Sequence, residues 1–221
     1  MSALDQKLFF LINREWTGPW LDRIMVTLSS LDFWVPWLVL LFVAVAYFGG
    51  FKARALLLTL LVAVGVAEGA VVGPFKDWIG RPRPSQVVDQ ARLPSFNHKI
   101  KPQTLAIFYP LRIKKAKVKP EEPRPRGGSF PSGHVTNNFA CATVIALFYR
   151  RRGWLAFLPA AGIGYSRIYT ASHWPSDVVF SMPIGVAIGV VVVALLGAAW
   201  RRWGTKVAAP LFIKHPEWIA S

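Results

Sequence analysis

The sequence has little charge, few acidic residues and a single cysteine. Charged residues make up 17% of the 221 positions, against about a quarter in a typical soluble domain. Together with a hydrophobic content of 53%, this shortage of charge excludes an ordinary soluble domain and is typical of a membrane protein. The one cysteine, Cys141, excludes an internal disulfide and therefore says nothing about the redox compartment.

The features of a cleavable signal peptide are also lacking. Charged Asp5 and Lys7 precede the apolar run at residues 8–12, and polar residues 13–15 interrupt it, so we expect the N-terminus to be retained. Apolar residues that recur at helical spacing, such as Leu4 and Leu8, predict amphipathic helices over residues 1–31 that lie along the membrane interface.

Long apolar runs dominate the rest of the chain. Five of them approach or reach the roughly 17–25 residues that a helix needs to cross a bilayer: Phe33–Gly49, Leu56–Phe75, Val135–Tyr149, Trp154–Tyr169 and Val178–Trp200. The sequence therefore predicts one all-α domain over residues 1–221, a polytopic membrane helix bundle. It has five spans, or six if the N-terminal region adds a short one.

The basic residues predict an orientation. Short basic segments follow the first, third and fifth predicted spans, and such segments are typically cytoplasmic: Lys52 and Arg54, Arg150–Arg152, and Arg201, Arg202 and Lys206. The loop over residues 81–131 is then extracytoplasmic, although it is basic as well. We attribute the net charge of +15 to orientation and anionic headgroups, and expect no nucleic-acid partner because no binding module accompanies it.

Three polar stretches interrupt the apolar pattern on the same predicted side of the membrane. They are "KDWIGRPRP" at the end of the second span, "FPSGH" at the start of the third and "SRIYTASHWPSD" at the end of the fourth. Ionisable residues at the membrane edge are costly and usually face the bundle interior. Their convergence therefore predicts a functional site.

The residue types in these stretches suit a phosphoryl group. Lys76, Arg83 and Arg167 provide positive charge, and the planar donors of arginine match phosphate oxygens. Of the two histidines, His134 and His173, one can attack phosphorus while the other protonates the leaving oxygen.

Two further features of the motifs support this chemistry. Asp177 follows His173 by four residues, so one helical turn can bring its carboxylate to the imidazole. The small residues of "PSGH" begin a helix whose free N–H groups can receive a phosphate oxygen.

These motifs resemble the three signatures of the type 2 phosphatidic acid phosphatase (PAP2) superfamily. The matches are K-x6-RP at Lys76–Pro84, PSGH at Pro131–His134 and SR-x5-H-x3-D at Ser166–Asp177. The resemblance implies an all-helical core related to vanadium-dependent haloperoxidases and hydrolysis of phosphate esters or anhydrides without a metal or cofactor.

The resemblance also implies residue roles. His173 would be the nucleophile that forms a phosphohistidine, Asp177 its orienting partner and His134 the general acid. The phosphate would be bound by the remaining motif residues: Lys76, Arg83, Ser132, Gly133 and Arg167.

Several alternatives stay open. The substrate is a lipid phosphate in the bilayer, with undecaprenyl diphosphate favoured over phosphatidylglycerol phosphate, phosphatidate or lipid A, and a bacterial inner membrane is expected. An anion or lipid transporter without hydrolysis is the alternative class, and a haloperoxidase is a weaker one. Arg81 is interpreted as a headgroup or loop contact, and Glu68 as a structural carboxyl in preference to a proton relay. The sequence gives no oligomeric state.

Overall fold

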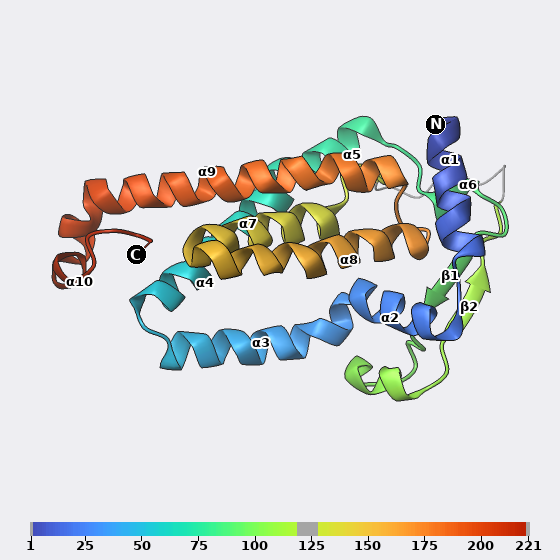
Figure 1. Ribbon diagram of the computed structural model, residues 1–221, viewed down its shortest axis with the longest axis horizontal. Coiled ribbons are helices and arrows are strands. Elements are labelled where there is room, and N and C mark those ends of the chain that lie inside the picture. Colours follow the sequence, from blue (N-terminus) through green and yellow to red (C-terminus); the bar gives the residue numbers. More distant parts are fainter. Residues whose placement is uncertain (1, 119–127, 220–221) are drawn as a thin grey trace.

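The computed structural model describes residues 2–118 and 128–219, which form a mostly helical protein (Figure 1). Its α-helices are α1 (Ala3–Phe10), α2 (Pro19–Ser29), α3 (Leu31–Phe48), α4 (Phe51–Val66), α5 (Gly73–Ile79), α6 (Pro84–Val87), α7 (Gly133–Gly153), α8 (Phe157–Tyr169), α9 (Pro175–Val207) and α10 (Ala209–Lys214). Short π-helical turns at Leu11–Glu15 and Ala67–Val72 and 3₁₀ turns at Gln103–Phe108 and Trp154–Ala156 join them. The strands are β1 (Arg92–Ser95) and β2 (Arg112–Lys115).

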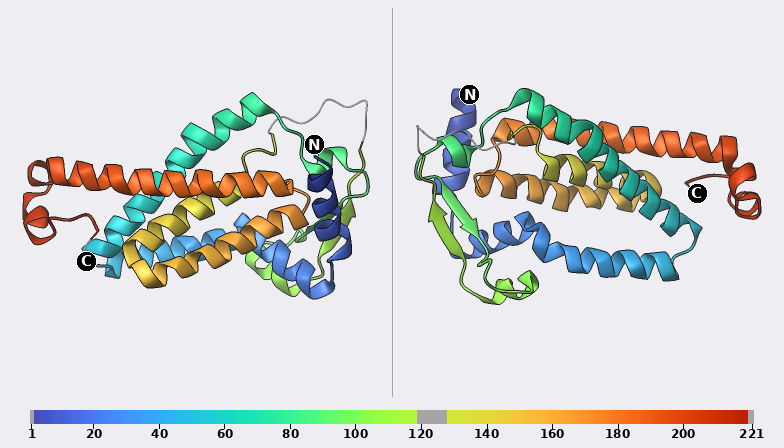
Figure 2. Two further views of the ribbon diagram at one scale, coloured as in Figure 1. Left: turned by 45° about the horizontal axis from the view of Figure 1, so that its top comes forward. Right: turned by 180° about the vertical axis from the view of Figure 1, so that it is seen from behind.

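Helix α7 lies at the centre of the bundle and packs against α4, α8 and α9 (Figure 2). Small residues let α9 approach it closely. A Cβ atom built on Gly185 would lie 2.4 Å from the carbonyl oxygen of Thr136, and one on Gly189 would lie 2.7 Å from Cβ of Thr143. Close contact through small residues is the usual way in which helices pack within a membrane.

Among the described residues, three helical segments are long and apolar enough to cross a membrane: α3, the segment Phe51–Val87 that includes α4 and α5, and α9. No residue of α3 is buried by the protein, as expected for a helix that faces lipid. The other two predicted spans also form helices, α7 and α8. However, α8 has only 13 residues, and α7 carries amide, hydroxyl and arginine side chains. The helical bundle is confirmed, whereas the count of five spans stays a prediction.

The N-terminal helix α1 turns Asp5 and Phe9 toward the bundle. Leu4 and Leu8 are exposed, at 65% and 37%, whereas Asp5 and Phe9 are buried. Phe9 packs on Trp174 at a centroid distance of 5.3 Å, and Asp5 accepts hydrogen bonds from the backbone and side chain of Ser176. Helix α1 thus covers the start of α9. Its predicted place along the membrane interface leaves the two leucines free for lipid contact and stays a prediction.

The loop over residues 81–131 contains more structure than expected, and residues 119–127 of it lie outside the described residues. Strands β1 and β2 form an antiparallel pair in which Arg92 faces Lys115, so the chain is not helical throughout. Four-residue strands with Pro94 in one of them give no clear alternating pattern. Buried Asn13 fixes the hairpin in place because its side chain bonds both backbone groups of Arg92 and the carbonyl of Tyr169.

Candidate active site

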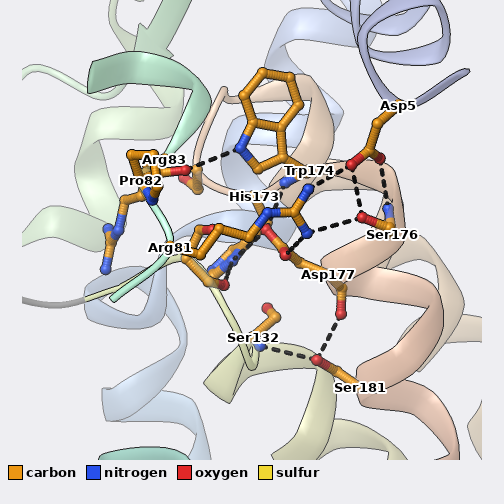
Figure 3. Close-up of polar contacts among 12 residues, drawn as sticks. Asp5, Arg81, Pro82, Arg83, Ser132, His173, Trp174, Ser176, Asp177 and Ser181 are labelled. Carbon is orange, nitrogen blue, oxygen red and sulfur yellow. Dashed lines mark hydrogen bonds and ion pairs between the residues drawn. The ribbon is translucent and has the colours of Figure 1, made fainter. Parts of the chain in front are cut away.

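The three predicted polar stretches meet at one end of the bundle, close to α1 (Figure 1). Helix α7 begins there at Gly133, α8 ends there at Tyr169 and α9 begins there at Pro175. Figure 3 shows Arg81, Arg83, Ser132, His173 and Asp177 in this region. The structure therefore brings together residues that the sequence separates by about a hundred positions.

A tight turn between α8 and α9 places His173 beside Arg167. Both Ser172 and His173 donate backbone hydrogen bonds to the carbonyl oxygen of Arg167, at 3.0 and 3.1 Å. Ala171 has φ of 56°, a left-handed conformation that ends α8 and reverses the chain. The backbone, rather than side-chain packing alone, thus sets the spacing of the two residues.

The contacts of His173 determine which ring nitrogen is available for chemistry. The imidazole is 3% exposed, and its Nδ1 lies 2.5 Å from the carbonyl oxygen of Ser129. A carbonyl oxygen only accepts hydrogen bonds, so Nδ1 carries the proton and donates it. Nε2 of the neutral ring is then left with its lone pair.

Asp177 does not make the direct hydrogen bond to His173 that the spacing suggested. Its Oδ2 lies 3.9 Å from Nδ1 of His173, beyond hydrogen-bond distance. The carboxylate is already engaged, because it caps α9 by accepting the N–H of Trp174 at 2.9 Å and accepts a hydrogen bond from Arg81 at 2.5 Å. The direct acceptor from His173 is instead the Ser129 carbonyl, a backbone group that no side-chain pattern identifies.

Arg81 is the site residue that the sequence analysis misjudged. Its guanidinium bridges two buried carboxylates, with Nη1 2.5 Å from Asp177 and Nη2 2.5 Å from Asp5 (Figure 3). Nη1 also donates to the Ser176 hydroxyl at 2.9 Å, and the group lies 5.9 Å from the ring of Trp174. Arg81 is therefore an internal bridge between α1 and α9, not a headgroup contact.

The cations lie close enough to both histidines to affect their protonation. Burial, followed by the positive charges of Arg167, Lys76 and Arg83, lowers the pKa of His134 from 6.5 to about 4. Burial and the same cations, Arg167 first among them, also hold the pKa of His173 well below its ordinary value. Both imidazoles are thus neutral at pH 7 and face a concentrated positive charge.

Ser132 and Gly133 occupy the turn that starts α7. Ser132 is fully buried, and its backbone N–H donates to the Ser181 hydroxyl at 2.8 Å (Figure 3). This N–H is therefore not free to bind a phosphate oxygen, contrary to the expectation from the sequence. The next N–H groups, at the first turn of α7, have no acceptor within the helix. A Cβ atom on Gly133 would lie 2.9 Å from Oε1 of Glu68. Asn137 donates to the same oxygen at 2.6 Å, which supports a structural role for Glu68.

A cavity of about 410 Å³ adjoins the site, with His134 and Arg167 in its wall. The junction of α2 and α3 forms one side, and the β1–β2 hairpin with Lys114 forms another. Arg167 is held at this wall by hydrogen bonds from Nη1 to the side chain and the carbonyl of Ser29. Among the described residues, no group of three or more His, Cys, Asp or Glu could hold a metal ion.

Comparison with known proteins identifies the family of this arrangement. A family model described as the PAP2 superfamily matches residues 53–201, which include every predicted site residue. The lipid A 1-phosphatase of Porphyromonas gingivalis is 40% identical over 73 residues, covering 30% of this chain and 16% of that protein. The undecaprenyl-diphosphatase BcrC of Bacillus subtilis is 35% identical over 88 residues, covering 39% of this chain and 45% of that protein. The chain thus spans less than half the length of these relatives.

Solved structures share the fold. The crystal structure of Aquifex aeolicus LpxE matches with a TM-score of 0.58 and 24% identity, covering 87% of this chain and 96% of that chain. A transmembrane PAP2-type phosphatidylglycerolphosphate phosphatase from Bacillus subtilis matches with a TM-score of 0.56 and 20% identity, covering 88% of this chain and 87% of that chain. Both matches extend over nearly the whole bundle, in agreement with an integral membrane fold.

Proposed function

Because the chain belongs to the PAP2 superfamily, we propose that it is an integral membrane phosphatase that hydrolyses a lipid phosphate or diphosphate through a phosphohistidine. The observation that carries the proposal is the convergence of three cations, Lys76, Arg83 and Arg167, near two buried imidazoles whose pKa values they lower. Buried polar atoms without a hydrogen-bond partner add support: Nε of Arg83, Nε of Arg167 and Oγ of Ser132. A phosphate that accepts from these donors offsets the cost of about 1–3 kcal/mol that each unpaired group carries.

In the first step of the proposed reaction, the Nε2 lone pair of His173 bonds to phosphorus and the bond from phosphorus to the lipid oxygen breaks. His134 gives its proton to that oxygen, and the lipid alcohol or lipid phosphate leaves. Bound phosphate counters the cations that depress the pKa of His134, so substrate binding favours the protonated acid. Water then attacks the phosphohistidine, returns a proton to His134 and releases inorganic phosphate from His173.

The cations act on the charge of the transferred group. Lys76, Arg83 and Arg167, with Ser132 and Gly133 at the start of α7, would hold the three equatorial oxygens. Asp177 acts on His173 only indirectly. It fixes the start of α9 and binds Arg81, while the Ser129 carbonyl accepts the hydrogen bond from Nδ1 of His173. No step in this scheme requires a metal ion.

We propose undecaprenyl diphosphate as the substrate. The similarity to a protein named as an undecaprenyl-diphosphatase supports this choice. The adjoining cavity, whose lining includes Lys114 and Arg167 along with one acidic residue, Asp32, offers room and positive charge for the second phosphate. The lipid tail would remain in the bilayer. We propose a bacterial inner membrane, and the basic short segments support an active site on its extracytoplasmic face.

Phosphate release by the purified protein tests the proposal. Undecaprenyl diphosphate, phosphatidylglycerol phosphate, phosphatidate and lipid A are compared with EDTA present. We expect the highest turnover with the first and inhibition by vanadate. Faster release from another lipid would reassign the substrate, whereas loss of turnover in EDTA that magnesium restores would contradict the metal-free mechanism. Binding without turnover of any of these lipids would favour the transporter.

Three variants separate chemistry from binding. His173→Ala should abolish phosphate release and retain vanadate binding, because the cations remain. Arg167→Ala should weaken both. His215→Ala is the matched control, since this histidine stacks on Phe51 at the far end of the chain and should leave both unchanged. Release near the wild-type rate by His173→Ala would move the nucleophile elsewhere.

A further inference from the structure

A second, larger cavity lies toward the end of α7 that is opposite the candidate active site. Its volume is about 1030 Å³, and its wall combines basic residues with an apolar surface. The basic residues are Lys52 in the first turn of α4 and Arg150 and Arg151 near the end of α7. Of the described residues that line it, Glu217 is the acidic one against three basic ones, so this part of the wall carries an excess of positive charge.

The apolar part of the wall follows two neighbouring helices. Leu147 of α7 and Val186 and Val190 of α9 line the cavity. Leu147 and Val190 are 38% and 47% exposed, so the protein itself does not cover this surface. A narrow apolar surface that ends in arginines has the chemistry of a lipid tail joined to an anionic headgroup.

The position of the cavity also points to a lipid. Arg150 lies about 25 Å along α7 from Gly133 at the candidate active site, from the rise of an α-helix. The hydrocarbon core of a bilayer is about 30 Å thick, so the arginines reach the opposite boundary of the membrane. Trp154, 65% exposed, lies in the same wall, as expected of an aromatic residue at that boundary.

The backbone of α7 is distorted at Arg150, one of the two arginines that line the cavity. Arg150 has φ of 46° and ψ of −115°, which interrupts the helical geometry of α7. Non-glycine residues in such conformations carry strain and concentrate at functional positions. The two adjacent arginines thus do not continue the regular helical face.

We propose that this cavity binds an anionic glycerophospholipid of the leaflet opposite the active site. Arg150 and Arg151 hold its phosphate, and one acyl chain lies along Leu147, Val186 and Val190. Basic pockets between transmembrane helices on the cytoplasmic side are a recurring way to bind anionic headgroups. A soluble anion would leave the apolar part of the wall exposed, and the membrane that surrounds the bundle supplies the lipid.

Native mass spectrometry of the full chain in detergent tests this site, with phosphatidylglycerol and phosphatidylethanolamine as probes. We expect phosphatidylglycerol to bind more tightly. The double variant Arg150→Gln/Arg151→Gln should weaken its binding about thirtyfold, from the contribution of two basic residues near an anionic lipid. The matched control is Arg201→Gln/Arg202→Gln, an adjacent arginine pair near the end of α9 that does not line the cavity, and it should retain wild-type affinity.

A second pair of variants tests the apolar part of the site independently of charge. Val190→Trp should fill the groove and reduce lipid binding, whereas Val191→Trp, its exposed neighbour outside the cavity, should not. Phosphate release, measured in parallel, confirms that each variant is folded. Equal losses in both arginine pairs, equal affinity for the two lipids, or equal effects of the two tryptophans would overturn the proposal.

Discussion

Replacement of Arg81 by methionine offers the sharpest test of how the site is held together. Arg81 is 22% exposed, and its partner Asp177 is fully buried. Removal of one partner from a buried ion pair typically costs about 3–5 kcal/mol. In the variant, Asp177 still accepts a hydrogen bond from the N–H of Trp174, and Asp5 still accepts those from the backbone and side chain of Ser176. We therefore expect a loss of stability at the lower end of this range, about 3 kcal/mol.

Activity should fall further than this loss of stability explains. The α9 terminus that carries Asp177 also positions the turn with His173, and a misplacement of about 1 Å at a reacting group costs on the order of 100-fold in rate. We therefore expect kcat of Arg81→Met to fall about 100-fold at a temperature where the variant is still folded. Arg81→Lys, which keeps the charge but bonds one carboxylate, should recover part of the rate.

Arg92 provides a closely matched control. It pairs with buried Asp22 at 2.9 Å and lies 6.0 Å from the ring of Tyr169, much as Arg81 lies over Trp174. Asp22 keeps the Tyr169 hydroxyl at 2.6 Å, so Arg92→Met should lose similar stability while its kcat stays near wild type. Thermal unfolding in detergent and initial rates of phosphate release measure both quantities. Equal loss of kcat in the two methionine variants, or a wild-type kcat in Arg81→Met, would refute the reasoning.

Further predictions concern pH, packing and topology. Because the folded-state pKa of His134 is lowered to about 4, the unfolded chain binds more protons than the folded protein between pH 6.5 and 4. The free energy of unfolding should therefore fall as the pH drops through this window. Thermal unfolding should show a smaller fall in His134→Gln. Gly185→Ala places a Cβ atom 2.4 Å from a backbone oxygen of α7 and should lower the free energy of unfolding by about 1–3 kcal/mol. Gly65→Ala, whose Cβ atom would have nothing within 4 Å, should not destabilise the protein. Denaturation of both variants in detergent measures the difference. In a cysteine-free background, an impermeant thiol reagent added outside the cell should label Lys99→Cys and not Thr205→Cys, and the reverse pattern would invert the proposed orientation.

The sequence indicated which residues come together at one end of the bundle because phosphate chemistry restricts their types, and their roles stay predictions. Phosphate binding and transfer need cations and imidazoles, and these side chains interrupt apolar runs where few other reasons retain them. His134, His173 and Arg167 are recognisable for this reason. The apolar runs of α3 and α9 were equally clear, because length and composition alone identify a span.

The connections between these residues could not be predicted in the same way. The acceptor from His173 is a backbone carbonyl of Ser129, which any residue type could supply. The helical interval between His173 and Asp177 permitted a contact. However, the carboxylate of Asp177 instead accepts hydrogen bonds from Arg81 and from the backbone N–H at the start of α9. Asp5 lies on a helix whose apolar residues suggest a membrane surface, so nothing local reveals that its carboxylate is buried against Arg81.

The last described residues have a consequence for how the protein is made. The Trp218 indole donates to the Thr59 hydroxyl at 3.0 Å and is 8% exposed, so a residue of α4 acquires its partner from a position 159 residues later. Because a chain is synthesised at about 5–20 residues per second, Trp218 follows Thr59 by about 8–30 s. Glu217 and Ile219, which border Trp218, line the larger cavity, so its wall also forms last. The packing of α4 is therefore completed only after the whole bundle has been synthesised.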